Sequence, residues 1–260
     1  MADLRNYQAP RYGTAGVQAD ASIDQGLRAY MIRVYNLMAL GLAITGVAAL
    51  GTVSLATTSD PSQAVATLGN GSMLTALGAT LYGSPLRWVV MLAPLAMVFF
   101  LSFRIEKMSL PAAQATFWAY AAMMGVSLSS IFLVYTAQSI TQTFFITATA
   151  FGALSLWGYT TKRDLTGMGS FLIMGVFGLV IAMVVNIFLQ SSALQFAVSA
   201  IGVLIFAGLT AYDTQKIKEM YFEGDGALVA GRKAIMGALR LYLDFINLFM
   251  FMLQFMGNRE

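Results

Sequence analysis

The segment Phe171–Leu189 reads FLIMGVFGLVIAMVVNIFL and contains no charged side chain. As a helix it falls within the roughly 17 to 25 residues that cross the hydrocarbon core of a bilayer. The whole chain has 260 residues, of which 58% are hydrophobic and only 10% are charged. Because soluble domains carry about 25% charged residues, this composition indicates a membrane protein and excludes a soluble globular enzyme.

Six other apolar runs have a comparable character, so the sequence predicts an all-α, polytopic membrane protein built as a bundle of seven transmembrane helices. The last run is the most polar, and an alternative with six helices omits it. The longest connection, Thr57 to Pro85, is expected to form an exposed loop or a short interfacial or re-entrant helix. The six runs are Val34–Ala56, Trp88–Phe103, Ala112–Tyr135, Phe144–Tyr159, Leu194–Tyr212 and Leu241–Gly257.

The positions of the lysines and arginines predict the orientation, because cytoplasmic connections retain positive charge. With the amino terminus in the cytoplasm, only Arg87 and Arg259 lie outside. We therefore expect residues 1–30 to form a flexible cytoplasmic tail and residues 31–260 to form the seven-helix domain. The inner side then holds Arg5, Arg11, Arg28, Arg33, Arg104, Lys107, Lys162, Arg163, Lys216, Lys218, Arg232, Lys233 and Arg240.

The absence of cysteine and histidine restricts the chemistry that the chain can perform. A disulfide framework, a thiolate nucleophile, a usual zinc site and a Ser-His-Asp triad are all excluded. The net charge of +3 is too small, in so apolar a chain, to indicate a nucleic-acid partner. Acid–base chemistry must come from carboxylates, and we expect neither an enzyme nor a bound cofactor.

Two aspartates lie in the last two apolar segments, where an ionisable side chain costs roughly 2.5 to 3.5 kcal/mol and indicates a functional site. If Lys216 and Arg240 mark the inner ends of these helices, Asp213 lies about 4.5 Å and Asp244 about 6 Å beyond them, so the carboxylates could meet. If the last helix instead begins near Arg232 and Lys233, Asp244 lies about 17 Å deep and the match is lost.

A structural interpretation of the same residues remains open. Asp213 with Lys216, and Arg240 with Asp244, have the spacing of ordinary intrahelical ion pairs. Arg104, which ends the second apolar segment, could supply a counter-charge at the same level. Asn247 and Asn186 could line a polar path through the bundle, although each could equally form an interhelical hydrogen bond.

Three stretches resemble a known family. GLTAYDTQKIK (208–218) and GALRLYLDFINLF (237–249) resemble the two signature stretches of the Bax inhibitor-1 family, and FMGNR (255–259) resembles its usual ending. The similarity is greatest to bacterial YccA-like members and runs from about Arg28 to the end. It implies an inner-membrane seven-helix bundle and a pH-dependent calcium leak, gated by two aspartates that share a proton and are latched by an arginine of the second helix. The aspartates correspond to Asp213 and Asp244, and Arg104 corresponds to the arginine by its position in the span.

The implied mechanism is physically reasonable. Two carboxylates a few Å apart resist ionising together, so the pair holds one proton near neutral pH and keeps the inner mouth closed. Full ionisation would separate the last two helices and expose oxygen ligands for Ca²⁺, which we expect as a permeant ion bound transiently by Asp213 and Asp244. Calcium prefers 6 to 8 oxygen ligands, so water and backbone carbonyls would supply the others.

Two other functions share features with this sequence, an intramembrane aspartyl protease and a non-conducting regulator. Intramembrane aspartyl proteases also use two aspartates, one of them in a Tyr-Asp pair such as Tyr212-Asp213, but the Gly-x-Gly-Asp motif of those enzymes is replaced here by Leu241-Tyr242-Leu243-Asp244. The resemblance also allows a non-conducting regulator, either as partner of a membrane-bound protease in quality control or as a modulator of stress and cell death. Such a role would depend on the amino-terminal tail.

Overall fold

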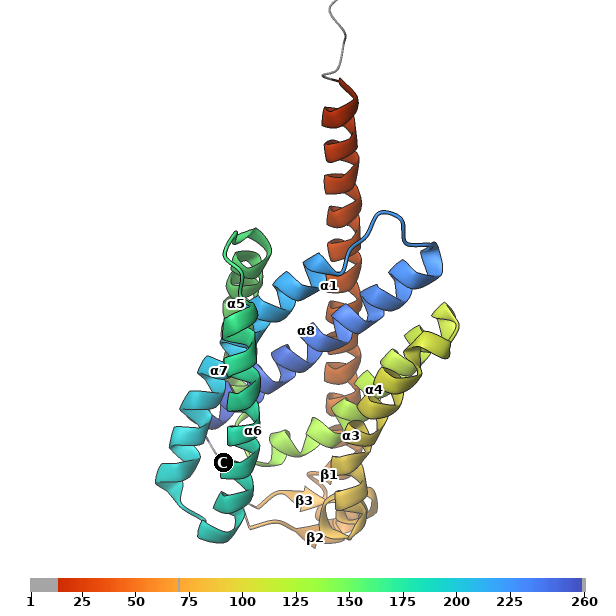
Figure 1. Ribbon diagram of the computed structural model, residues 1–260. Helices are drawn as coiled ribbons and strands as arrows, with labels where there is room; N and C mark the ends of the chain where they lie inside the picture. The colour runs from red at the N-terminus through yellow and green to blue at the C-terminus, as the bar shows by residue number, and fades with distance from the viewer. Residues whose placement is uncertain (1–13, 70, 259–260) are drawn as a thin grey trace, which may run out of the picture.

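The computed structural model describes the backbone of residues 14–69 and 71–258, and side chains from Gln25 onward (Figure 1). Within these residues, seven helices are long and apolar enough to cross a membrane, which confirms the predicted seven-helix bundle. The alternative with six helices is wrong, because the last one is continuous over 30 residues. The seven are α1 (Thr14–Ala56), α3 (Leu86–Arg104), α4 (Leu110–Leu128), α5 (Ala137–Thr160), α6 (Thr166–Leu189), α7 (Ser192–Glu219) and α8 (Ala227–Met256).

Most helices extend beyond the apolar runs, because polar residues cap them and polar turns project past the apolar stretch. The hydroxyls of Thr136 and Ser191 accept hydrogen bonds from the backbone N–H groups at the starts of α5 and α7. Short 3₁₀ helices, η3 (Ile105–Lys107) and η4 (Ser129–Leu133), continue α3 and α4. Helix α1 begins at Thr14, so it includes residues 14–30 of the expected tail, and residues 1–13 lie outside the described residues.

The connection between α1 and α3 differs from both expectations for it. It holds a three-stranded antiparallel sheet in the order β1-β3-β2, followed by two helical turns, rather than a plain loop or only a short interfacial or re-entrant helix. Backbone pairing within this small sheet satisfies N–H and C=O groups that a plain loop would leave to water. The elements are β1 (Thr57–Thr58), η1 (Pro61–Gln63), β2 (Ala66–Thr67), β3 (Met73–Leu74), α2 (Ala76–Gly78) and η2 (Ala79–Gly83).

Helix α8 is the centre of the bundle. It contacts α1, α4, α5 and α7, and 67% of its most apolar window is buried inside the protein. In Figure 1, α8 runs obliquely across the molecule, whereas α1 stands upright. Two glycines allow neighbouring helices to approach closely: a Cβ at Gly125 of α4 would lie 2.3 Å from the Thr45 carbonyl oxygen, and one at Gly158 of α5 would lie 2.2 Å from that of Ala211.

Candidate functional site

The structure brings Asp213 of α7 and Asp244 of α8 together. Their carboxyl groups lie close enough to interact, although they are 31 positions apart in the chain. Asp244 is only 5% exposed, and its Oδ2 atom accepts no hydrogen bond from any N–H or hydroxyl group of the described residues. Because two neighbouring carboxyl groups resist ionising together, this arrangement fits a pair that shares a proton.

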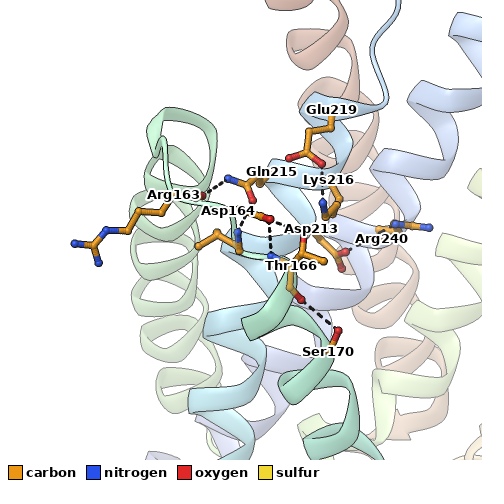
Figure 2. Close-up of polar contacts among 10 residues, drawn as sticks. Arg163, Asp164, Thr166, Ser170, Asp213, Gln215, Lys216, Glu219 and Arg240 are labelled. Atoms are coloured by element: carbon orange, nitrogen blue, oxygen red, sulfur yellow. Dashed lines mark hydrogen bonds and ion pairs between the residues drawn. The ribbon is translucent and has the colours of Figure 1, made fainter.

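Arg240 provides the positive charge beside the pair. Figure 2 shows Arg240 next to Asp213. The Nη1 atom of Arg240 lies 3.9 Å from Oδ1 of Asp213, whose side chain is 17% exposed. The guanidinium also acts electrostatically on Asp244, one helical turn along α8. The Arg240 side chain is itself 47% exposed, so the positive charge lies on the more accessible side of the ion pair.

The two carboxylates meet although they lie at unequal distances from the ends of their helices. Helix α8 begins at Ala227, well before Arg240, so Asp244 lies about 25 Å along its axis. Asp213 lies only about 9 Å from the end of α7 at Glu219. The expectation that unequal depths would separate them assumed parallel helix axes, whereas α8 crosses the bundle obliquely (Figure 1).

The ordinary intrahelical ion pairs that the spacing allowed are replaced by other contacts. Lys216 pairs with Glu219 at 2.7 Å rather than with Asp213. The Arg240 guanidinium lies beside Asp213 on the neighbouring helix, and it acts on Asp244 only through long-range electrostatics. The aspartate pair is therefore an interhelical feature that joins α7 to α8.

The segment beside Asp213 is anchored to the α5–α6 connection, as Figure 2 shows. The Gln215 side chain accepts a hydrogen bond from the Leu165 N–H at 2.9 Å and donates one to the Arg163 carbonyl at 2.8 Å. Within this connection, hydrogen bonds from the hydroxyl and the backbone N–H of Thr166 lower the pKa of the exposed Asp164 carboxyl from its ordinary value. Gln215 thus holds the carboxyl end of α7 in place through a neutral side chain.

Arg104 lies elsewhere. It is exposed at the end of α3, and it forms no ion pair with a residue that the structure describes. Helix α3 packs mainly on α4 and on the short elements next to it in the chain, which places it away from α7. The arginine that faces Asp213 is therefore Arg240 rather than Arg104.

The two asparagines also lie apart from each other. The Asn247 amide donates to the Leu243 carbonyl of its own helix at 2.8 Å. Asn186 accepts a hydrogen bond from the Ser191 N–H at 3.0 Å, where it stabilises the turn formed by Gln190 with φ of 50° at the end of α6. Both side chains make local contacts, neither of the interhelical kind.

Sequence reasoning missed three hydrogen bonds between hydroxyl groups around the site. Tyr35 of α1 hydrogen-bonds Ser155 of α5 at 2.7 Å, and Ser155 hydrogen-bonds Thr214, the residue after Asp213, at 2.8 Å. Thr45 of α1 and Tyr242 of α8 form a separate pair at 2.7 Å. Hydroxyl residues are too common in apolar helices to reveal such partners, although Tyr242 lies inside one of the signature stretches.

The described residues contain no group of three or more histidine, cysteine, aspartate or glutamate side chains that could hold a metal ion. Two aspartates alone leave most positions of a calcium ion unfilled. The pair is therefore chemically suited to a proton or to brief contact with a cation.

Comparisons with known proteins agree with this architecture. Residues 27–260 match the family described as "Inhibitor of apoptosis-promoting Bax1". An uncharacterized protein of Rickettsia prowazekii is 47% identical over 239 residues, which cover 92% of this chain and 93% of the relative. An uncharacterized protein of Caulobacter vibrioides is 48% identical over 247 residues, or 94% of each chain.

A third relative has a location in its name. The inner membrane protein YbhL of Escherichia coli is 51% identical over 173 residues, which cover 66% of this chain and 74% of YbhL. Together with the seven apolar helices, these matches identify the chain as a multi-pass membrane protein that belongs to the Bax inhibitor-1 family.

Proposed function

We propose that this protein is a pH-sensitive calcium leak channel of the bacterial inner membrane, gated by the contact between Asp213 and Asp244. The observation that carries the proposal is the interhelical carboxyl pair, in which Asp244 is buried and Asp213 has an arginine beside it. The name of the relative YbhL and the excess of positive charge on one side support the location and a cytoplasmic amino terminus.

Electrostatics gives the direction of the pH response. Two unit charges 4 Å apart repel by about 4 kcal/mol at an effective dielectric constant of 20. With one shared proton, the pair attracts and holds α7 against α8. Once pH rises far enough to remove that proton, the two charges repel each other and Arg240 offsets only part of the repulsion. Flux is therefore expected to increase with pH.

The burial of Asp244 makes helix separation necessary for conduction. At 5% exposure its carboxyl has almost no contact with water, so an ion reaches it only if α8 moves relative to its neighbours. The opened pair offers hard oxygen ligands, which suit Ca²⁺, and water completes the coordination. Such weak binding favours passage, because a conducted ion must be released as well as bound.

The test is calcium flux into proteoliposomes that contain the purified full chain, measured between about pH 6 and pH 8. We expect wild-type flux to rise with pH. Asp213→Asn and Asp244→Asn should each remove most of this dependence, because neither retains two groups that can repel each other. Asp164→Asn is the matched control, since that exposed carboxyl has a lowered pKa and is ionised throughout this range, and the asparagine oxygen can still accept the hydrogen bonds of Thr166.

Two results would contradict the proposal. The first is wild-type flux no higher than that of empty liposomes at every pH, which would favour a non-conducting regulator. The second is a pH dependence that both site variants retain unchanged.

A further inference from the structure

A long apolar groove lies between α1 and α5. Both helices pack on α8, and Phe245 of α8 forms part of the groove between them. The groove has a volume of about 660 Å³ and is lined on its two sides by residues such as Met38 and Leu42 of α1 and Ala148 and Gly152 of α5. This volume lies in the range of ligand pockets, roughly 300 to 1,000 Å³.

The groove opens on a surface that faces lipid. Its rim residues Ile32, Phe144 and Leu156 are 48%, 40% and 63% exposed. All three lie in helices that span the membrane. An acyl chain can therefore enter sideways from the bilayer, without crossing water.

One end of the groove is cationic. Arg28 and Tyr159 both line the groove. The Nζ atom of Lys218 lies 2.8 Å from the carbonyl oxygen of Tyr159 and 5.1 Å from the centroid of the Tyr159 ring. Among the side chains that the structure describes, from Gln25 onward, the groove lining contains no aspartate or glutamate. An anionic headgroup would meet Arg28 in the lining, with Lys218 bonded to the neighbouring lining residue Tyr159.

We propose that this groove binds one anionic phospholipid, with an acyl chain between α1 and α5 and the headgroup phosphate on Arg28. Because the acyl chain moves from the apolar bilayer into an apolar groove, its burial discriminates little between lipids. The cations supply the selection. Each basic residue near a membrane surface favours an anionic lipid by about five-fold.

Native mass spectrometry of the full-length protein, released from nanodiscs of equal phosphatidylglycerol and phosphatidylcholine, tests the proposal. We expect the wild type to retain one phosphatidylglycerol per chain, at least about five-fold more often than phosphatidylcholine. Gly152→Leu should lose the bound lipid, because its side chain projects into the groove. A Cβ at Gly152 meets no atom within 4 Å, so the substitution fills space without a clash.

Matched controls separate the groove from the rest of the surface. A Cβ at Gly178, on the exposed side of α6, also meets no atom within 4 Å, and Gly178→Leu should retain the lipid. Arg28→Gln should bring phosphatidylglycerol and phosphatidylcholine to near-equal retention. Arg33→Gln, an exposed position on the same helix outside the groove, should leave the preference intact.

Several outcomes would overturn the proposal. These are a wild type that retains no lipid, equal retention by Gly152→Leu and Gly178→Leu, or a wild type with no preference for phosphatidylglycerol. A lipid-free dimer that Gly152→Leu dissociates would show that a second copy of the chain occupies the groove instead.

Discussion

Helices α6 and α8 are both continuous and long enough to span a bilayer, yet they occupy opposite environments. In α6, the most hydropathic of the seven, only 11% of the most apolar window is buried inside the protein. In α8 the corresponding share is 67%, and this helix contains the buried aspartate. Lipid tails are as apolar as leucine, so an apolar helix gains no hydrophobic energy from burial in the bundle, whereas one with polar groups needs partners. In this membrane protein, the less apolar helix forms the core.

The largest expected effect comes from a substitution in α8 that leaves a cavity in the packing around this helix. Leu248 is 1% exposed, and Leu248→Ala should destabilise the protein by about 2 to 5 kcal/mol through lost packing and an unfilled space. Leu189→Ala, at a position of α6 that is 64% exposed, should change stability by less than about 0.5 kcal/mol. Unfolding of the two variants in detergent measures the difference, and equal losses would contradict the contrast between the helices.

A charged side chain should be costly on α6, although this helix tolerates the loss of an apolar side chain. Phe177 lies at the middle of α6 and is 66% exposed, so Phe177→Lys places an ammonium group in lipid at a cost of about 2.5 to 3.5 kcal/mol. Phe177→Leu should be neutral. The fraction of chains inserted into membranes measures this effect. Normal insertion of the lysine variant would mean that another surface covers this face of α6.

The smallest effect concerns a single interhelical hydrogen bond of α8. Tyr242→Phe removes the hydroxyl that contacts Thr45 at 2.7 Å and keeps the ring, which packs against Phe117 and Tyr120. Such bonds within membranes average about 0.6 kcal/mol, so the melting temperature should fall only slightly. A loss as large as that of Leu248→Ala would show that this contact organises the core.

The sequence was sufficient to predict the seven helices and to single out Asp213 and Asp244, because apolar runs and rare intramembrane charges are local signals. The sequence was insufficient to identify the arginine that lies beside Asp213, because the position of a residue along a span does not show which helices become neighbours. Arg104 ends a helix that packs on α4, whereas Arg240 reaches Asp213 because α8 crosses obliquely. The small sheet after α1 was missed for a related reason, since strands of two residues have no periodicity to detect.

A reversible cross-link between α7 and α8 tests whether separation of these helices controls conduction. A Cβ at Gly237 of α8 would lie 2.9 Å from the Ile217 side chain of α7, close to the aspartate pair along both helices. The natural chain contains no cysteine, so Ile217→Cys with Gly237→Cys introduces a single thiol pair. Oxidation should abolish calcium flux in proteoliposomes at about pH 8, and reduction should restore it, while each single variant should be insensitive to oxidant. Equal flux from the cross-linked and reduced protein would contradict the proposed gate.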